Sequence, residues 1–401
     1  MKIKVGVFFG GSSVEHDISI ITAVQAMEHI DKNKYEVVPV YITKDRIFYT
    51  GPMLKDMETF RDFKSVKKYL KKVSLVKKGD EFALVTYDSL FKRTVATIDV
   101  AFPIVHGKGV EDGSIAGYLD SIGIPYVGPK VLGAALGQDK VVQKQVLKAE
   151  GVNIVDYIWF YDDEYLADEK AIFAKVKKLG YPCIVKPAKL GSSIGISFVS
   201  DESKLAEAIE DAISYDEKII IEKVVENLLE VDCAVYGNHS YMETSLIGEM
   251  LTSNKFLTFE DKYIAEGGKK GPSKKLGASK TNHSVETAGF KIPAKLDKEI
   301  ETKIYDQSKK AFRALELSGV TRFDFLVNKK TKEVYVNEPN TIPGSLSFFF
   351  FTPKGKKYPK LLDEMITTAI KEYKNHTRKT TSFESNVLST YDGSKGCKGK
   401  M

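Results

Sequence analysis

The sequence predicts a fold with α/β and α+β parts, in which an N-terminal doubly wound α/β domain precedes a mixed region. Apolar strand-like runs alternate with helical patterns as far as residue 130. Further along, β-rich runs at 321–328 and 333–338 flank a short polar turn, which is typical of an antiparallel hairpin. The 401 residues are too many for one compact core, so we expect two or three domains.

The first domain is expected to begin with a strand at 3–9 that runs through the sequence GGSS into a helix at 18–30. A doubly wound domain needs further strands that alternate with helices. We expect these as strands at 36–42, 98–105 and 124–127, with a helix at 113–122. This domain would end near residue 130.

The remainder of the chain starts with helix and strand patterns and then becomes richer in strands. We expect helices at 139–150, 165–179 and 359–374, and strands at 155–160, on both sides of a loop at 188–195, at 218–225 and at 230–236. From residue 376 the chain is rich in Ser, Gly and Lys, which predicts a flexible tail. The expected units are therefore 1–130, 131–225 and 226–375, followed by the tail 376–401.

The composition is that of a soluble globular protein, with 43% hydrophobic and 28% charged residues. No apolar run approaches the roughly 18 residues of a membrane span. The N-terminal run MKIKVGVFFGG reads as a strand and is too short for a signal peptide. We therefore expect a cytoplasmic protein with neither a membrane nor a nucleic acid as partner, and reduced thiols at Cys183, Cys233 and Cys397.

Hard oxygen ligands gather on one face of the predicted hairpin. Side chains two apart on a strand share a face, which places Arg322 beside Asp324 and Glu338 beside Asn340. Carboxylate and amide oxygens without His or Cys suit Mg²⁺, which takes its remaining ligands from water and substrate phosphates. The hairpin therefore predicts an enzyme that uses a nucleoside triphosphate. The alternative is an ordinary charged hairpin with a solvated face.

A glycine-serine loop follows the strand that ends in Lys186. Its sequence AKLGSSIG lets the backbone fold closely over a ligand, and Ser192, Ser193 and the backbone amides can donate to phosphate oxygens. Lys186 would supply a point charge. The loop lies between two strands and the chain lacks GxxxxGK[ST], so it is not a Walker A loop. The alternative is a simple turn.

Five further residues have both a functional and a structural interpretation. The strand IIIEKVV carries Glu222 and Lys223, and its edge could bind adenine while Glu230 takes ribose hydroxyls; each could equally be a surface charge. Glu15 lies at a predicted helix N-terminus, where an acid usually compensates the helix dipole. His106 lies in a strand-end loop where ligands gather in α/β domains, although a lone His is more often structural.

The order of these segments resembles that of ATP-grasp enzymes. Lys140, Lys186, GSSIG, EKVV, RFDF and NEPN follow one another as they do in that superfamily, and the match is closest to D-alanine:D-alanine ligases. The resemblance runs from residue 3 to about residue 372 and includes the motifs GGSSVEHDISI, HGKGVEDG, GIPYVG, QDKVVQK, VKPAKLGSSIG, DKY, RFDF and NEPNTIPG. It implies a two-lobed ATP-grasp fold behind an N-terminal substrate domain, with the central lobe at 131–225 and the C-terminal lobe at 226–375.

The resemblance implies roles for residues around ATP. Lys140, Lys186 and Lys262 would hold phosphates together with Ser192 and Ser193, and Glu230 would hold the ribose. The adenine would be surrounded by Glu222, Lys223, Val225, Phe256 and Leu326. Asp324, Glu338 and Asn340 would bind two Mg²⁺ ions, bridged by Glu338, and Mn²⁺ is a possible substitute.

The resemblance also implies roles around the amino acid substrates. Glu15 would anchor the ammonium of the first D-alanine in contact with Ser192 and Tyr263, with His106 nearby. Arg322 and the amide of Gly344 would stabilise a tetrahedral oxyanion. Ser345 or Ser347 would hold the carboxylate of the second substrate, because Phe349 and Phe350 stand where the family has a serine-leucine pair. Two other departures are Val110 in place of a glycine, and a long basic lid at 264–291.

The implied activity is ATP-dependent ligation of two D-alanines for peptidoglycan precursor synthesis, by a homodimer. Two alternatives remain. One is a ligase of the same fold with D-serine or D-lactate as acceptor, although ester-forming relatives generally lack the tyrosine found here at position 263. The other is a nucleotide-binding regulator without catalysis, which the intact metal carboxylates, Arg322 and phosphate lysines disfavour.

Overall fold

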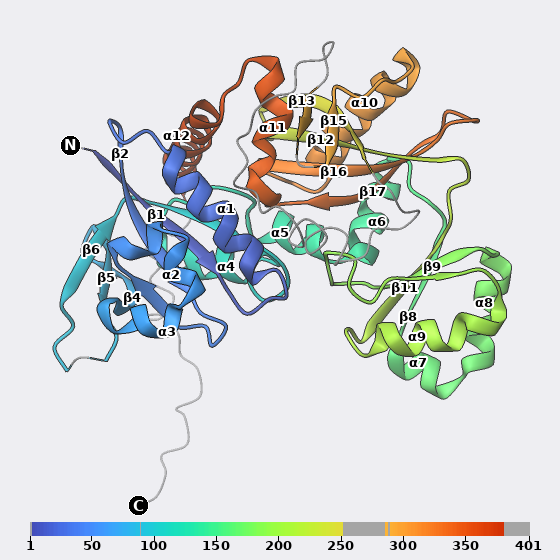
Figure 1. Cartoon of the computed structure of the whole chain (residues 1–401), viewed down its shortest axis with the longest axis horizontal. Coiled ribbons are helices and arrows are strands. Elements are labelled where there is room, and N and C mark those ends of the chain that lie inside the picture. The colour runs from blue at the N-terminus through green and yellow to red at the C-terminus, as the bar shows by residue number, and fades with distance from the viewer. Residues whose placement is uncertain (1, 89, 252–284, 288, 381–401) are drawn as a thin grey trace, which may run out of the picture.

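The computed structural model describes residues 2–88, 90–251, 285–287 and 289–380. For residues 285–287 it describes the backbone only. These residues form a seven-stranded, a four-stranded and a six-stranded sheet. Figure 1 shows the seven-stranded sheet on the left of the molecule, with the six-stranded sheet at the upper right and the four-stranded sheet at the lower right. The sequence prediction of mixed α/β and α+β architecture is confirmed.

The seven-stranded sheet has the order β6-β5-β4-β3-β2-β1-β7. Only its β2-β1-β7 part is parallel, and the other strands pair antiparallel. The strands are β1 (Ile3–Gly10), β2 (Tyr35–Ile42), β3 (Phe48–Thr50), β4 (Lys71–Lys78), β5 (Glu81–Thr86), β6 (Thr94–Ile98) and β7 (Val100–Val105). The doubly wound pattern therefore holds for the parallel part, and the antiparallel extension through β3–β6 was not predicted.

Two predicted strands of this domain need correction. The run 98–105 is not one strand. Asp99 interrupts it between β6 and β7, and its carboxylate accepts a hydrogen bond from the Lys4 amide at 2.7 Å. The run 124–127 makes only an isolated bridge between Tyr126 and Ala101. Both errors have the same cause. A period-two pattern does not encode which side chain bonds at the end of a strand, or whether a strand finds neighbours to pair with, because tertiary packing decides both.

Helix α1 (His16–His29) leaves the end of β1 through a tight glycine turn. Gly10 has a φ of 92°, and a Cβ there would lie 2.2 Å from the Ile42 carbonyl oxygen. Only glycine fits this turn, which directs α1 back over the sheet. The remaining helices of this part are α2 (Glu58–Arg61), α3 (Phe63–Val66) and α4 (Ser114–Ile122).

The four-stranded sheet has the order β10-β9-β11-β8. Its strands are β8 (Tyr157–Tyr161), β9 (Cys183–Pro187), β10 (Ser197–Val199) and β11 (Lys218–Lys223), covered by α7 (Asp162–Ala167), α8 (Glu169–Leu179) and α9 (Leu205–Ile213). The helix predicted at 165–179 is two helices. Asp168 separates them, because its carboxylate accepts from the Ala171 amide and so caps α8.

The six-stranded sheet has the order β14-β15-β13-β12-β16-β17. Its strands are β12 (Leu228–Asn238), β13 (Tyr241–Met250), β14 (Val285–Thr287), β15 (Phe290–Ile292), β16 (Gly319–Asn328) and β17 (Val334–Asn340), and α10 (Lys298–Ala314) packs on it. The predicted hairpin is confirmed, with Arg322 opposite Asn340 and Asp324 opposite Glu338.

Two helical segments connect the three sheets. Helix α5 (Val131–Gln138) lies against α4 and β17 in the middle of the molecule, and α6 (Lys140–Ala149) follows it between the four-stranded and six-stranded sheets (Figure 1). Helices α11 (Phe348–Phe351) and α12 (Tyr358–Thr377) return to the N-terminal sheet, where Leu361 and Ile366 join its core. Of the predicted tail, residues 381–401 lie outside the described residues.

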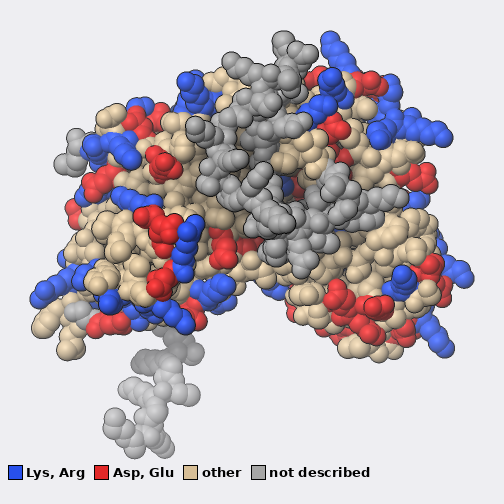
Figure 2. Space-filling view, viewed as in Figure 1, with Lys and Arg blue, Asp and Glu red and all other residues tan. Residues whose placement is uncertain are grey.

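The described surface mixes charges of both signs. Figure 2 shows Lys and Arg interspersed with Asp and Glu over the face in view, in keeping with a net charge of only +6. Among the described helices, none is both long and apolar enough to cross a membrane. Cys183 and Cys233 are buried free thiols, as expected.

Candidate active site

The glycine-serine loop is held against the start of α6. Lys140 donates from its backbone amide to the Ala188 carbonyl at 2.9 Å and from Nζ to the Leu190 carbonyl at 2.6 Å. Two serines of the loop are left-handed, with φ of 56° at Ser192 and 60° at Ser193. Each such residue costs about 1–2 kcal/mol, so the surrounding contacts must impose this conformation. Strain of this kind clusters at ligand sites.

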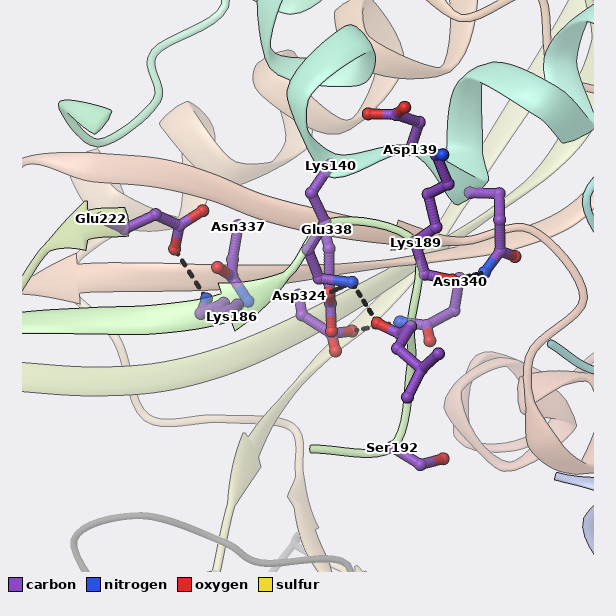
Figure 3. Close-up of polar contacts among 12 residues, drawn as sticks. Asp139, Lys140, Lys186, Lys189, Ser192, Glu222, Asp324, Asn337, Glu338 and Asn340 are labelled. Atoms are coloured by element: carbon purple, nitrogen blue, oxygen red, sulfur yellow. Dashed lines mark hydrogen bonds and ion pairs between the residues drawn. The ribbon is translucent and has the colours of Figure 1, made fainter. Parts of the chain in front are cut away.

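A buried cluster of charges lies beside this loop (Figure 3). Glu222 at the end of β11 pairs with Lys186 at 2.6 Å and with Lys144 of α6 at 3.0 Å. Burial alone would raise the pKa of Glu222, but Lys144 and Lys186 lower this pKa to about 2. Burial lowers the pKa of Lys186, yet Glu222 and Glu338 raise it on balance. The raised pKa favours the charged form of Lys186, as a phosphate ligand requires, and its Nζ lies against Glu222.

The β16–β17 hairpin brings the predicted metal ligands together. Asn340 Nδ2 donates to Asp324 Oδ1 at 3.1 Å, and Glu338 pairs with Lys140 at 3.2 Å. The donors are oxygens from two carboxylates and an amide, so their chemistry fits Mg²⁺. Among the described residues no group of three or more His, Cys, Asp or Glu could hold a metal ion; the predicted ligand set has only two carboxylates, and its third member is the amide of Asn340.

Arg322 lies on the same face of the hairpin. Its Nε and Nη2 donate to the two oxygens of Asp324 at 2.7 and 3.0 Å, and Nε also lies 2.9 Å from the buried Asp232. These pairs hold the guanidinium in a fixed plane. Arg322 therefore has a structural role as the partner of Asp324. This role does not conflict with the predicted catalytic role.

Glu15 occupies the N-cap position of α1, but its side chain does not cap the helix. Its side chain makes no hydrogen bond to the first turn of α1, and instead its carboxylate accepts a hydrogen bond from the Ser192 hydroxyl. The backbone of two glycines lies against the carboxylate, since a Cβ would lie 2.7 Å from it at Gly107 and 3.1 Å at Gly191. Burial, together with the nearby Glu111, raises the pKa of Glu15. A partly desolvated carboxylate suits an ammonium ligand.

His106 lies close to Glu15 and is buried. Burial lowers its pKa, which favours the neutral ring, and within the described residues its Nε2 has no hydrogen-bond partner. Val110, which replaces a family glycine, is buried and packs over Gly11. The Val110 side chain therefore packs inside the turn, and the loop that carries it keeps its form.

Two residues that sequence reasoning missed connect parts of the site. Glu111 accepts from Gly107 in its own loop and from Thr341 and Ile342 beyond the hairpin, at 2.8 to 3.0 Å. Lys144 is completely buried and donates to the Asn337 carbonyl as well as pairing with Glu222. Both belong to motifs quoted above, HGKGVEDG and QDKVVQK, but nothing local distinguishes them from surface charges.

The turn after the hairpin is unusual. Ser345, Leu346 and Ser347 all have φ near 50°, and the Ser345 amide donates to Thr22 Oγ1 at 3.1 Å. Ser347 is fully buried, and its hydroxyl has no partner among the described residues. Phe350 is a core residue, since it is buried and its ring centroid lies 5.1 Å from that of Phe290, whereas Phe349 is half-buried and packs against that core.

The remaining predicted ligands are distributed around these groups. Glu230 of β12 stands opposite Leu326 of β16, Lys223 is exposed and Val225 is half-buried just beyond β11. Gly344 begins the left-handed turn. Three predicted residues, Phe256, Lys262 and Tyr263, and most of the lid at 264–291 lie outside the described residues.

Comparison with known proteins is consistent with this geometry. Family models described as the D-ala D-ala ligase N-terminus and C-terminus match residues 4–129 and 146–367. The chain is 39% identical over 390 residues to a D-alanine–D-alanine ligase of Thermosipho melanesiensis, covering 96% of this chain and 98% of that protein.

Solved structures agree. The D-alanine-D-alanine ligase from Coxiella burnetii superposes with a TM-score of 0.76 at 26% identity, over 94% of this chain and 96% of that one. The VanG D-Ala:D-Ser ligase from Enterococcus faecalis superposes with a TM-score of 0.75 at 27% identity, over 92% and 100%. With both family models and a near full-length relative in agreement, the chain belongs to the D-alanine:D-alanine ligase family.

Proposed function

We propose that this protein joins two D-alanines into D-alanyl-D-alanine at the expense of ATP, releasing ADP and phosphate, for peptidoglycan precursor synthesis. The observation that carries the proposal is the junction of Glu15, the 188–195 loop and the β16–β17 hairpin in a chain of this family. One group for each part of the reaction is present there: a carboxylate for an ammonium, lysines for phosphates and oxygen ligands for Mg²⁺.

The nucleotide would lie between the four-stranded and six-stranded sheets. Lys140 and Lys186 would hold its phosphates together with Ser192, Ser193 and Lys262. Glu222, Lys223, Val225, Phe256 and Leu326 would surround the adenine, and Glu230 would bind the ribose. The support for this placement is that Lys140 of α6 pairs with Glu338 of the hairpin while the buried Lys186 of β9 pairs with Glu222 of β11, so that cations come from both sides (Figure 3).

Asp324, Glu338 and Asn340 would hold two Mg²⁺ ions, and Mn²⁺ would be accepted in their place. When bound, these ions neutralise charge on the transferring phosphoryl group. The oxygen-only donor set on one face of the hairpin supports this assignment.

The chain's own residues then act in two steps. Glu15 holds the ammonium of the first D-alanine, with Ser192, Tyr263 and His106 around it, while the substrate carboxylate attacks the γ-phosphorus and ADP leaves. The amine of the second D-alanine next attacks the acyl phosphate carbonyl, and phosphate leaves. Arg322 and the Gly344 amide are proposed to stabilise the oxyanion of this second step.

The acceptor site would be the left-handed turn, with Ser345 or Ser347 holding the carboxylate of the second substrate. D-serine is a second candidate acceptor, because the fold is close to that of a D-Ala:D-Ser ligase. We further propose that the protein is a cytoplasmic homodimer whose units are 1–130, 131–225 and 226–375. Light scattering after size exclusion tests the dimer.

Phosphate release tests the reaction. Purified protein with ATP and MgCl₂ is given D-alanine, D-serine or D-lactate, alone and in pairs, and the products are identified by mass spectrometry. We expect D-alanyl-D-alanine with one phosphate per dipeptide. ATP binding without any condensed product would instead favour the regulator.

A further inference from the structure

The acceptor turn Gly344–Ser347 has a backbone that local forces disfavour. Three successive residues that are not glycine adopt φ of 51°, 48° and 50°. Each such conformation is unfavourable for an L-residue, so contacts from outside the turn must hold it in place. The turn is also short, so its position follows directly from what it is attached to.

Helix α1 provides that attachment. The Ser345 amide donates to the hydroxyl of Thr22, a residue that is 1% exposed. One turn earlier on the helix, Ile18 lies beneath Gly344, since a Cβ on that glycine would lie 4.0 Å from Ile18 Cγ2. Leu346 is buried in the same core as the N-terminal sheet. The acceptor turn is therefore seated on α1.

The same helix carries the proposed donor ligand at its first turn. Glu15, Ile18 and Thr22 are spaced three and four residues apart, so they follow one another along one face of α1. Seven residues of helix correspond to about 10 Å along the axis. The proposed ammonium ligand of the first substrate and the support of the second are thus held at a set separation by one helix.

We propose that Thr22 is a positioning residue for the acceptor amino acid, because its hydroxyl holds the Ser345 amide and thereby places the acceptor turn relative to Glu15. This inference rests on the proposed ligase reaction. An amine attacks an acyl carbonyl productively only from about 3 to 3.5 Å. Because the turn holds only the acceptor, a small displacement of the turn should impair acceptor binding and amine attack, and leave the formation of the acyl phosphate unchanged.

The test compares Thr22→Val, which keeps the shape and loses the hydroxyl, with Thr22→Ser, which keeps the hydroxyl. Rates of dipeptide formation against D-alanine concentration give separate KM values for the donor and acceptor sites. For Thr22→Val we expect the acceptor KM to rise about tenfold, with the donor KM and the ATP KM unchanged. Thr22→Ser should restore the wild-type acceptor KM.

A second readout isolates the first step. Hydroxylamine attacks the acyl phosphate carbonyl in place of the second D-alanine, forming D-alanine hydroxamate as the carbon–oxygen bond to phosphate breaks. Hydroxamate formation should be equal in wild type and Thr22→Val. Thr50→Val serves as matched control, because Thr50 is also buried in this domain and donates to the Pro39 carbonyl at 2.7 Å. It should lower thermal stability and leave every KM unchanged.

The outcomes separate the two proposals. If wild type makes no dipeptide, the ligase proposal fails. If wild type is active and Thr22→Val keeps the wild-type acceptor KM, or raises all KM values alike, the positioning role of Thr22 is overturned while the ligase stands. Should Thr22→Val not fold, Thr22→Ala against Thr22→Ser provides the same comparison.

Discussion

The charged residues of the site neutralise one another in pairs. Lys140 faces Glu338, Lys186 and Lys144 share Glu222, and Arg322 faces Asp324. Pairing lowers the cost of burying each charge. It also means that a substitution removes a partner as well as a ligand, so each residue test needs a folding measurement beside the activity.

Glu338→Gln removes charge from the centre of the proposed metal site. We expect turnover to fall at least about 100-fold, because the remaining ligands do not hold two Mg²⁺ ions together. Circular dichroism should show a folded protein. Wild-type phosphate release by folded Glu338→Gln would eliminate the metal assignment.

Arg322→Lys keeps a positive charge and loses the two parallel donors that now bind Asp324. If the guanidinium stabilises the oxyanion, turnover at saturating D-alanine should drop about 100-fold, because Lys cannot reproduce the forked geometry. ATP affinity, measured by calorimetry, should hardly change. Near-normal turnover together with a lower Tm would leave Arg322 with a structural role only.

Glu15→Gln tests a pH dependence. The folded pKa of Glu15 is raised above its ordinary value of 4.5 by burial and by Glu111. A raised pKa means that the carboxylate costs stability once pH exceeds the unfolded pKa, and that the cost is complete above the folded pKa. We therefore expect Glu15→Gln to have a higher Tm than wild type at pH 8 and an equal Tm at pH 4.

The D-alanine affinity of Glu15→Gln should fall at the same time, since the ammonium loses its counter-charge. The Glu15 carboxylate would then lower the stability of the fold while it strengthens the binding of D-alanine. An unchanged Tm difference between pH 4 and pH 8 would contradict the raised pKa.

At the scale of elements, α6 joins the two sheets that would enclose ATP. Val141 packs on Ile220 of the four-stranded sheet, whereas Leu147 lies in the core of the six-stranded one. Between them, Lys144 reaches both sheets through Glu222 and the Asn337 carbonyl. Lys144 is thus one contact that joins the two sheets, beside Lys140, which bonds the Leu190 carbonyl and Glu338; burial lowers the pKa of Lys144, while Glu222 opposes that shift.

Lys144→Met should lower the free energy of unfolding by about 3 kcal/mol, because it leaves a buried carboxylate with one cation fewer. Urea denaturation measures this. The matched control is Lys148→Met, one turn further along α6, where the lysine is exposed and we expect a change of less than about 0.5 kcal/mol. In wild type, the stabilisation from Glu222 is present above pH 4.5 and is lost as pH falls towards 2.

In Lys144→Met this acid loss should begin at a higher pH, since the pKa of Glu222 is no longer held as low. Equal urea midpoints for the Lys144→Met and Lys148→Met variants would show that the pair does not join the sheets.

For the whole molecule, side chains cross between all three sheets. Ser192 donates to Glu15, Lys108 lies 3.5 Å from the buried Asp216, and Thr341 donates to Glu111 at 2.8 Å. These contacts join the N-terminal sheet to both halves of the proposed nucleotide site. Ligand binding in the middle should therefore stabilise the whole chain.

ATP with Mg²⁺ at 100 times its Kd should raise the free energy of unfolding by about 2.7 kcal/mol in one cooperative transition. Differential scanning calorimetry checks this against ATP with EDTA. Two transitions, only one of which responds to the nucleotide, would show that the N-terminal sheet unfolds independently.

Local patterns alone determined much of this protein. Alternation with period two predicted the β16–β17 hairpin and the shared faces of Arg322 with Asp324 and of Glu338 with Asn340, because strand faces and turn residues are encoded within about twenty neighbouring positions; the register that sets Asp324 opposite Glu338 came from the structure. The motif order likewise indicated the family. The antiparallel strands β3–β6 and the break at Asp99 escaped prediction, because short half-exposed strands carry a weak pattern.

Tertiary structure alone decided which side chains meet. Glu111 reaches residue 342, Lys144 reaches residue 222 and Thr22 reaches residue 345, and nothing near any of them in sequence indicates its partner. It also resolved Glu15, whose position at a helix start suggested a cap and whose carboxylate instead contacts Ser192. The physical reason is that contacts between distant segments depend on how whole elements pack, whereas hydrophobic period and turn chemistry act between neighbours along the chain.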